Sequence, residues 1–220
     1  ETGKHAGRYL YRTHEVRPGT EPFTGGAVSV VDLKTGNAKI LAQRTDWEAL
    51  DGLVWTPWRS VLFAEETITS QLPDPDAPQA QSGLLYEMKF KKGDPSTMEA
   101  INVRPMLGSL AHEGIEIDEE GNVYVIDEDR KGSIYRFVPK NYGDLRSGQL
   151  YALRVKNGMK TGDAEWVALD MNQVQINARV AAQSVNATSF CRPEDLERIR
   201  NTLYAALTCE DAINPNNVDG

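Results

Sequence analysis

Short continuous runs of apolar residues recur along the chain, whereas apolar residues at helical spacing are scarce. The runs are rich in β-branched and aromatic side chains and are bounded by Gly, Asn, Asp or Pro, which is typical of strands. They cover residues 27–33, 52–55, 61–64, 84–90, 123–126, 133–138, 149–155 and 202–207. Glycines in the turns 34–37, 119–122 and 130–132 can adopt a positive φ between two strands. The pattern predicts an all-β protein built of antiparallel hairpins.

Two stretches depart from this pattern. Residues 71–82 contain three prolines and show no apolar period, which predicts a surface loop. Residues 171–186 tolerate a helix, with Val174, Ala178 and either Ala181 or Ala182 on one face, and predict a helical insertion. Because similar strands continue on either side of both stretches, we expect one domain over residues 1–220.

Three segments share one layout, in which an acid opens a strand, a turn and a second apolar strand follow, and a pair of acids ends the unit. The segments are 51–66, 113–128 and 194–210, so the opening acid and the last acid are 15, 15 and 16 residues apart. A further strand of the form Gly-x-apolar-Tyr follows the first two copies, at 83–86 and 132–135. Four antiparallel strands per copy predict the blades of a β-propeller.

The number of copies is small for a closed ring. The opening acids lie 62 and 81 residues apart, so the sequence holds three to four blades with insertions, whereas propellers have about four to eight. We expect the ring to be completed by a longer chain or by self-association with another copy.

The repeated acids predict a metal site. Innermost strands of a propeller meet at one channel, and like charges gathered there would be protonated unless a cation lies among them. Carboxylates favour a hard ion such as calcium. The densest group of acids, Asp127-Glu128-Asp129, is either a calcium site or a solvated hairpin end. The alternative for the whole set is that the carboxylates cap turns and remain in water.

Charge and cysteine content narrow the classes of function. The 24 basic and 32 acidic residues give a net charge of −8, which disfavours a nucleic acid or an anionic membrane as partner. No apolar run approaches the roughly 20 residues that span a bilayer.

If residues 192–207 form a hairpin that turns near 200–201, Cys191 and Cys209 lie opposite each other, close enough for a disulfide in an oxidising compartment.

Four islands of sequence resemble the PhoX-type alkaline phosphatases, a secreted bacterial family of six-bladed propellers. Residues 56–66 (TPWRSVLFAEE) are similar to its T-P-W-G-T-x-L-x-C-E-E segment, and 111–114 (AHEG) match its A-H-E-G motif. Residues 123–130 with 134–139 resemble its V-Y-x-x-E-D-R and Y-R-F-V-P segments, and 192–194 its R-P-E element. The islands lie between about residues 7 and 210.

The resemblance implies a phosphomonoesterase, periplasmic or extracellular, that acts on a phosphorylated small molecule with iron and calcium ions held by carboxylates. Glu65 or Glu66, Glu113 and Glu194 would be metal ligands, and Arg192 would bind the phosphate. Arg192 could instead make a structural ion pair with Asp195 or Glu197. His112 could protonate the leaving group or orient the neighbouring glutamate.

One position departs from the family pattern. Ala64 occupies the place of the cysteine that ligates iron, so calcium is the cofactor we expect and an iron site lacks its thiolate. A second reading is therefore an inactive, calcium-stabilised propeller that serves as a binding or scaffold module. A third is a lactonase-like or sugar-ester propeller that uses one calcium and needs no arginine.

Overall fold

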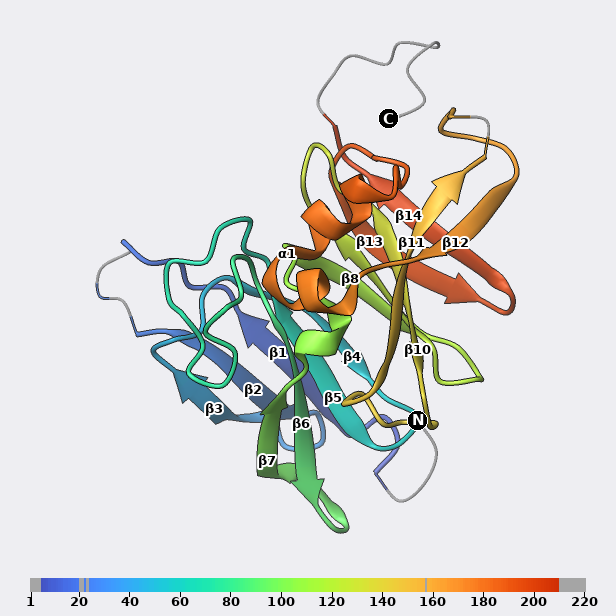
Figure 1. Cartoon of the computed structure of the whole chain (residues 1–220). Coiled ribbons are helices and arrows are strands. Elements are labelled where there is room, and N and C mark those ends of the chain that lie inside the picture. Colours follow the sequence, from blue (N-terminus) through green and yellow to red (C-terminus); the bar gives the residue numbers. More distant parts are fainter. Residues whose placement is uncertain (1–4, 20–21, 23, 157, 210–220) are drawn as a thin grey trace.

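The computed structural model describes residues 5–19, 22, 24–156 and 158–209. Within them, the chain forms four antiparallel sheets in which strand order follows chain order (Figure 1). The first holds β1 (Tyr9–His14), β2 (Gly26–Asp32) and β3 (Asn37–Arg44), and the second holds β4 (Leu50–Trp55), β5 (Ser60–Glu65), β6 (Leu85–Lys91) and β7 (Asp94–Val103). The third holds β8 (His112–Ile117), β9 (Val123–Asp127), β10 (Ile134–Pro139), β11 (Gly148–Val155) and β12 (Ala164–Ala168), and the fourth holds β13 (Pro193–Ile199) and β14 (Thr202–Leu207).

The prediction of a mainly β protein with antiparallel hairpins is confirmed, because each of the predicted runs overlaps a strand. Strands β8 and β13 are predicted only as the opening strands of the second and third repeat copies. Strands β1, β3, β7 and β12 are in neither set. Most of their side chains are half-buried or exposed, so they lack the continuous apolar runs that mark strands covered on both faces.

Each sheet packs face to face on the next, and a separate hydrophobic cluster fills each interface. The cluster between the first and second sheets includes Val28, Phe63 and Tyr86. The largest, between the second and third, is centred on residues such as Leu62 and Phe137. The remaining cluster lies between the third and fourth sheets, and its buried members are Ile126, Ile134, Phe190 and Leu196. The first strands of consecutive sheets, β1, β4, β8 and β13, consequently lie next to one another.

Strand β5 shows why the apolar runs do not alternate with polar residues. Val61 and Phe63 contribute to the cluster on one face of the second sheet, and Leu62 and Ala64 to the cluster on the other. Every residue of β5 is buried. A strand covered on both faces has no polar side, so its sequence is apolar throughout.

The insertion after the third sheet contains the helix α1 (Met171–Ser184), whose buried residues are Val174, Ala178, Ala181 and Ala182. Asp170 caps its first turn by accepting a hydrogen bond from the Asn172 amide. Asn177 interrupts the helix with φ −161° and ψ 100°. Its side chain accepts a hydrogen bond from the Val180 amide and so caps the second half. That half carries Arg179 toward the third sheet.

Residues 71–82 contain neither strand nor helix. They are not wholly at the surface, because Ala77 and Asp74 are buried. The Asp74 carboxylate accepts a hydrogen bond from the Tyr86 hydroxyl and pairs with Arg44. These contacts fasten the loop to the first two sheets.

Cys191 and Cys209 form a disulfide with Cα atoms 5.6 Å apart, which confirms the predicted pairing. The pairing follows from the hairpin of β13 and β14, in which Ile199 lies opposite Thr202. The bridge closes this hairpin directly beside Arg192 and Thr208. Disulfides persist in oxidising compartments, so the bridge is consistent with a location outside the cytoplasm.

Loss of this disulfide should lower the free energy of unfolding by about 3 kcal/mol, because the bridge closes a loop with a sequence separation of 18 residues. The comparison is urea unfolding of the wild-type protein with and without reductant. A variant with both Cys191→Ser and Cys209→Ser is the control and should be insensitive to reductant. Equal unfolding midpoints for all samples would show that the bridge does not stabilise the fold.

Candidate metal centre

In the acid pairs that end the repeats, the two side chains of one pair point to opposite faces of the sheet, because successive residues of an extended strand alternate in direction. Glu65 points into the core between the first and second sheets, where it accepts hydrogen bonds from the amides of Glu48 and Leu84. Glu66 follows on the opposite side. Asp127 and Glu128 divide in the same way at the end of β9. The second acid of each pair is therefore the one that reaches the space beside the first strands.

Three carboxylates from the second and third sheets meet there. Glu66, Glu113 and Glu128 each bring one oxygen to within 4.8 Å of the others. Calcium binds oxygens at about 2.3 to 2.6 Å, so ligands on opposite sides of one ion are about 5 Å apart. The spacing suits a single hard cation held by three sequence-predicted residues.

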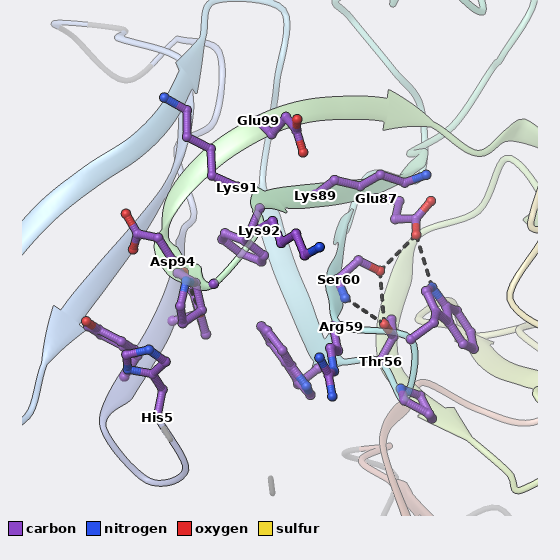
Figure 2. A pocket seen from close by; sticks show the side chains of 18 of the residues that line it. His5, Thr56, Arg59, Ser60, Glu87, Lys89, Lys91, Lys92, Asp94 and Glu99 are labelled. Atoms are coloured by element: carbon purple, nitrogen blue, oxygen red, sulfur yellow. Dashed lines mark hydrogen bonds between the residues drawn. The ribbon is translucent and has the colours of Figure 1, made fainter. Parts of the chain in front are cut away.

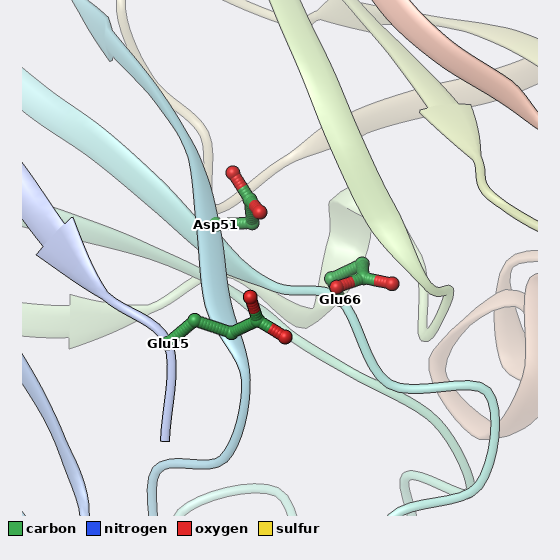
Figure 3. A group of neighbouring side chains, drawn as sticks. All are labelled: Glu15, Asp51 and Glu66. Atoms are coloured by element: carbon green, nitrogen blue, oxygen red, sulfur yellow. The ribbon is translucent and has the colours of Figure 1, made fainter. Parts of the chain in front are cut away.

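A second group of acids adjoins the first and shares Glu66 with it. Glu15, Asp51 and Glu66 also bring one oxygen each to within 4.8 Å of one another. Figure 3 shows the three side chains extending from neighbouring chain segments, with Glu15 following β1 and Asp51 on β4. Glu66 thus belongs to both groups and would be a shared ligand if each group held a cation.

Glycines next to the opening acids allow these strands to approach. A Cβ on Gly52 would lie 1.9 Å from the Glu113 carbonyl oxygen, and a Cβ on Gly114 would lie 2.4 Å from the Leu196 amide nitrogen. Only glycine can occupy such positions without moving the backbone. Asp51 and Glu113 therefore lie half-buried on closely packed strands and not in solvated turns.

Burial and mutual repulsion disfavour ionisation of this cluster. The pKa of Glu113 rises to about 8, first because of burial and then because of the charges of Asp51, Glu128 and Glu194. Burial also raises the pKa of Glu66, and a hydrogen bond to Glu128 adds to this effect. Burial acts to raise the pKa of Glu128 too, but its bonds with Glu66 and Arg192 outweigh burial and lower it. Glu66 and Glu128 therefore share a proton when no cation is bound.

Two arginines flank the acids. Arg192 Nη2 lies 2.7 Å from an oxygen of Glu128 and 2.7 Å from an oxygen of Glu194. Arg17 Nη2 lies 2.5 Å from Glu66 and 2.7 Å from Glu15. Predicted residues Arg192 and Glu194 thus lie at the edge of the cluster.

The fourth sheet supplies a hydroxyl where the other two supply a carboxylate. The amides of Glu66, Glu128 and Thr208 donate to the carbonyls of Ala49, Ala111 and Arg192, respectively, at equivalent places in their sheets. The Thr208 hydroxyl hydrogen bonds to Glu194. Glu210, the acid that the sequence repeat assigns to this role, lies outside the described residues.

Two of the predicted ligands do not lie in the cluster. Glu65 is buried, and burial raises its pKa to about 8. Its oxygens accept from two backbone amides and from Tyr86. Asp127 is fully buried and paired through both oxygens with Arg179, each at 2.6 Å. Both carboxylates hold neighbouring chain segments together, so Asp127-Glu128-Asp129 is neither one calcium site nor a solvated hairpin end.

His112 lies in the interior and not beside the carboxylates. Its side chain is fully buried, and its Nε2 is 3.0 Å from the Gly108 carbonyl oxygen. Burial lowers its pKa to about 4. The ring is therefore neutral at physiological pH, and its hydrogen bond orients a backbone segment.

No thiolate faces the cluster among the described residues, because both cysteines of the chain are in the disulfide. Ala64, at the position of the family's cysteine, is fully buried in the hydrophobic cluster between the second and third sheets. The donor set near the acids thus consists of carboxylate and hydroxyl oxygens, which suit calcium better than iron.

Sequence reasoning missed Glu15 and Arg17. Both follow β1, whose residues YLYRTH alternate too weakly in polarity to mark a strand. A repeat search also fails there, because no acid pair follows Glu15 at the expected spacing. Glu15 and Arg17 lie beside the acids because β1 contacts β4, and this contact is known only from the three-dimensional structure.

Comparison with known proteins gives one match. The family model described as alkaline phosphatase PhoX covers residues 53–219, about three quarters of the chain. No curated protein and no solved structure matches. No helix among the described residues has the length and apolar character needed to cross a membrane. The match includes Glu66, Glu113, Glu128 and the Arg192 segment, and the chain belongs to the PhoX alkaline phosphatase family.

Proposed function

We propose that this chain carries the metal centre of a calcium-dependent phosphomonoesterase built on a β-propeller. The observation that supports it most is the meeting of Glu66, Glu113 and Glu128 within 4.8 Å, beside an arginine. The four stacked sheets correspond to successive blades, and their first strands correspond to those that line a central channel. The disulfide and the family favour a periplasmic or extracellular location.

The residues suit a hard cation. Crowded acids with raised pKa values are stabilised when a positive ion replaces their shared proton. A bound cation supplies charge neutralisation for the phosphoryl oxygens of an ester. In this proposal the three glutamates are ligands, Glu15 and Asp51 form an adjoining subsite, and Glu194 orients Arg192.

Arg192 is the group of this chain that would bind the phosphate. A guanidinium can bind two phosphate oxygens at once. The Arg192 backbone has a φ of +44° and is held on both sides. Its amide donates a hydrogen bond to the Asp129 backbone carbonyl, and its carbonyl accepts one from the Thr208 backbone amide. The disulfide at Cys191 limits its motion further. The side chain is thus positioned before any ligand arrives, which lowers the entropic cost of binding.

A second candidate is a calcium-stabilised module that binds without hydrolysis. The buried Ala64 favours it, because this residue provides packing where the family pattern provides a thiolate. Both candidates require calcium at the cluster, and they differ only in whether the chain hydrolyses the ester that it binds. A lactonase-like reaction would leave Arg192 without a role in catalysis.

The test is hydrolysis of 4-nitrophenyl phosphate by the full chain in calcium alone and in calcium with iron. We expect hydrolysis in calcium, its loss in chelator, and a decrease of at least about tenfold in Arg192→Met, because a bidentate charged contact is lost. Phosphate hydrolysis unchanged in Arg192→Met would contradict the role proposed for Arg192. Calcium binding without turnover would identify the binding module.

The Ala64→Cys variant separates a decayed enzyme from an active one. If the thiolate is needed, this variant gains hydrolysis with iron, whereas Ala64→Ser, which adds an atom of similar size without a soft ligand, does not. Elemental analysis of both proteins shows whether iron accompanies the gain. Equal activity in wild type and Ala64→Cys would show that the site works without this ligand.

A further inference from the structure

A large pocket lies at the end of the second sheet opposite the acid cluster. Asp51 is the second residue of β4 and Trp55 is the last, so the two places are separated by about 13 Å of extended strand. The pocket has a volume of about 1070 Å³ and is lined by the ends of β1, β4 and β6 and by the turns next to them. Its size is ample for a small organic ligand.

A cluster of three aromatic rings forms one wall of this pocket. Tyr11, Trp55 and Phe90 contact one another in a triangle, with ring centroids 5.4 to 5.7 Å apart. The Trp55 ring makes interplanar angles of 20° with Tyr11 and 25° with Phe90. All three rings line the pocket and are partly exposed. An exposed ring face of such a cluster favours a planar aromatic ligand.

Positive charge gathers around the rings, although the protein as a whole is acidic. Arg59, Lys89, Lys91 and Lys92 line the pocket, and within the described part of the chain none of them makes an ion pair. In Figure 2, the side chains of Arg59 and Lys92 extend into the space between the two turns, whereas that of Lys91 points away. Two of the lining cations therefore extend into the pocket with no ion-pair partner among the described residues.

The carboxylates of the pocket do not balance these cations. Glu87 is buried and already paired with Arg104 at 2.5 Å, and it also accepts from Ser60 and Trp58. Asp94 accepts from the amide and hydroxyl of Ser96 in its own turn. Glu99 is the remaining lining carboxylate. The local balance is positive and favours an anion.

Arg59 occupies a backbone conformation that arginine rarely adopts. Its φ is +68° in the turn between β4 and β5, where glycine would be unstrained. The turn is closed by a hydrogen bond from the Thr56 amide to the Ser60 carbonyl. The fold thus holds a cationic side chain over the pocket at the expense of local strain, a feature that clusters at ligand sites.

We propose that this pocket binds an anion that carries a planar aromatic ring, with the ring against Trp55 and Phe90 and the anionic group between Arg59 and Lys92. The ligand chemistry could come from an aromatic carboxylate or from a nucleotide phosphate. The site is separate from the acid cluster and does not depend on the proposed phosphatase activity.

The experiment is calorimetric titration of the full chain with 2-naphthoate, in chelator so that no metal ion at the acid cluster can bind the carboxylate. We expect binding to be at least about tenfold weaker for cyclohexanecarboxylate, which lacks the flat ring, and for 2-naphthalenemethanol, which lacks the charge. A parallel titration with AMP identifies the source, since the tighter of the two aromatic anions has the better matched anionic group. Absence of binding by both, or equal binding of the cyclohexane acid, would overturn the proposal.

Arg59→Gly tests the site itself and should weaken 2-naphthoate binding about tenfold. Glycine suits the positive φ, so this variant keeps its fold. The matched control is Arg200→Gly, which removes another exposed arginine with a φ of +56° from the remote turn between β13 and β14. Equal affinities of the two variants would contradict the proposal. Glu113→Gln should bind 2-naphthoate like the wild type, which separates this pocket from the metal centre.

Discussion

Glu113→Gln should weaken calcium binding on the order of a hundredfold, because it removes one of three carboxylates that converge on a single cation position. Calcium at 100 times its dissociation constant should add about 2.7 kcal/mol to the free energy of unfolding of the wild-type protein. The variant should lose most of this gain. Calorimetric titration and thermal unfolding at several calcium concentrations measure the two quantities.

The control for this variant is Glu120→Gln, which removes an exposed carboxylate from the turn between β8 and β9. It has the same change in charge and should bind calcium like the wild type. If both variants keep the affinity of the wild type, the convergence of Glu66, Glu113 and Glu128 does not form a calcium site.

The pH dependence of the same protein follows from its raised pKa values. Without calcium, Glu113 keeps its proton up to about pH 8 in the folded state but loses it near its usual pKa in the unfolded state. The folded state then binds more protons, so its stability should fall as the pH rises from about 5 to 8. Calcium should reduce this fall and should bind more tightly at higher pH. A pH-independent calcium affinity would contradict the protonation of the cluster.

Arg179→Met should lower the free energy of unfolding by about 3 to 5 kcal/mol, because it leaves the fully buried Asp127 without its partner. Burial raises the pKa of Asp127 even with the arginine in place. Without the arginine, the carboxyl must become protonated or remain as an uncompensated charge. Denaturant unfolding at neutral pH measures the loss.

Arg146→Met is the matched control, since it removes an arginine of equivalent geometry from Asp144 at the surface. The Arg146 side chain is 74% exposed, so its loss should change the free energy of unfolding far less than the loss of Arg179. Adding Asp127→Asn to Arg179→Met should restore part of the stability, because the buried charge is then gone. Similar small losses in both single variants would show that burial does not strengthen the Asp127 pair.

The sequence was sufficient to predict the hairpins, the disulfide and the acids that gather at one place. It could not distinguish Glu65 from Glu66, because β5 is apolar on both faces and shows no polarity alternation that fixes the direction of either acid. Asp127 and Glu128 posed the same problem on β9. Their directions depend on which neighbouring sheet covers each face.

His112 shows a different limit. A histidine beside a predicted ligand suggests proton transfer, but the strand turns its ring into the interior. The sequence does not single out Arg59 for a related reason. Its proposed role in anion binding follows only from its positive φ and from the aromatic rings that line the same pocket. Chemical type is readable from a sequence, whereas the direction of a side chain requires packing partners.

The shared proton of Glu66 and Glu128 has a consequence for the order in which ligands bind. An empty cluster presents several acids, and among the residues that the structure describes, Arg17 and Arg192 are the cations that pair with them. A doubly charged ester approaching these acids would be repelled. A divalent ion that displaces the proton makes the site one charge less negative and weakens this repulsion. In the proposed phosphatase, cation binding should therefore precede ester binding, so that the concentration of free calcium controls the onset of hydrolysis.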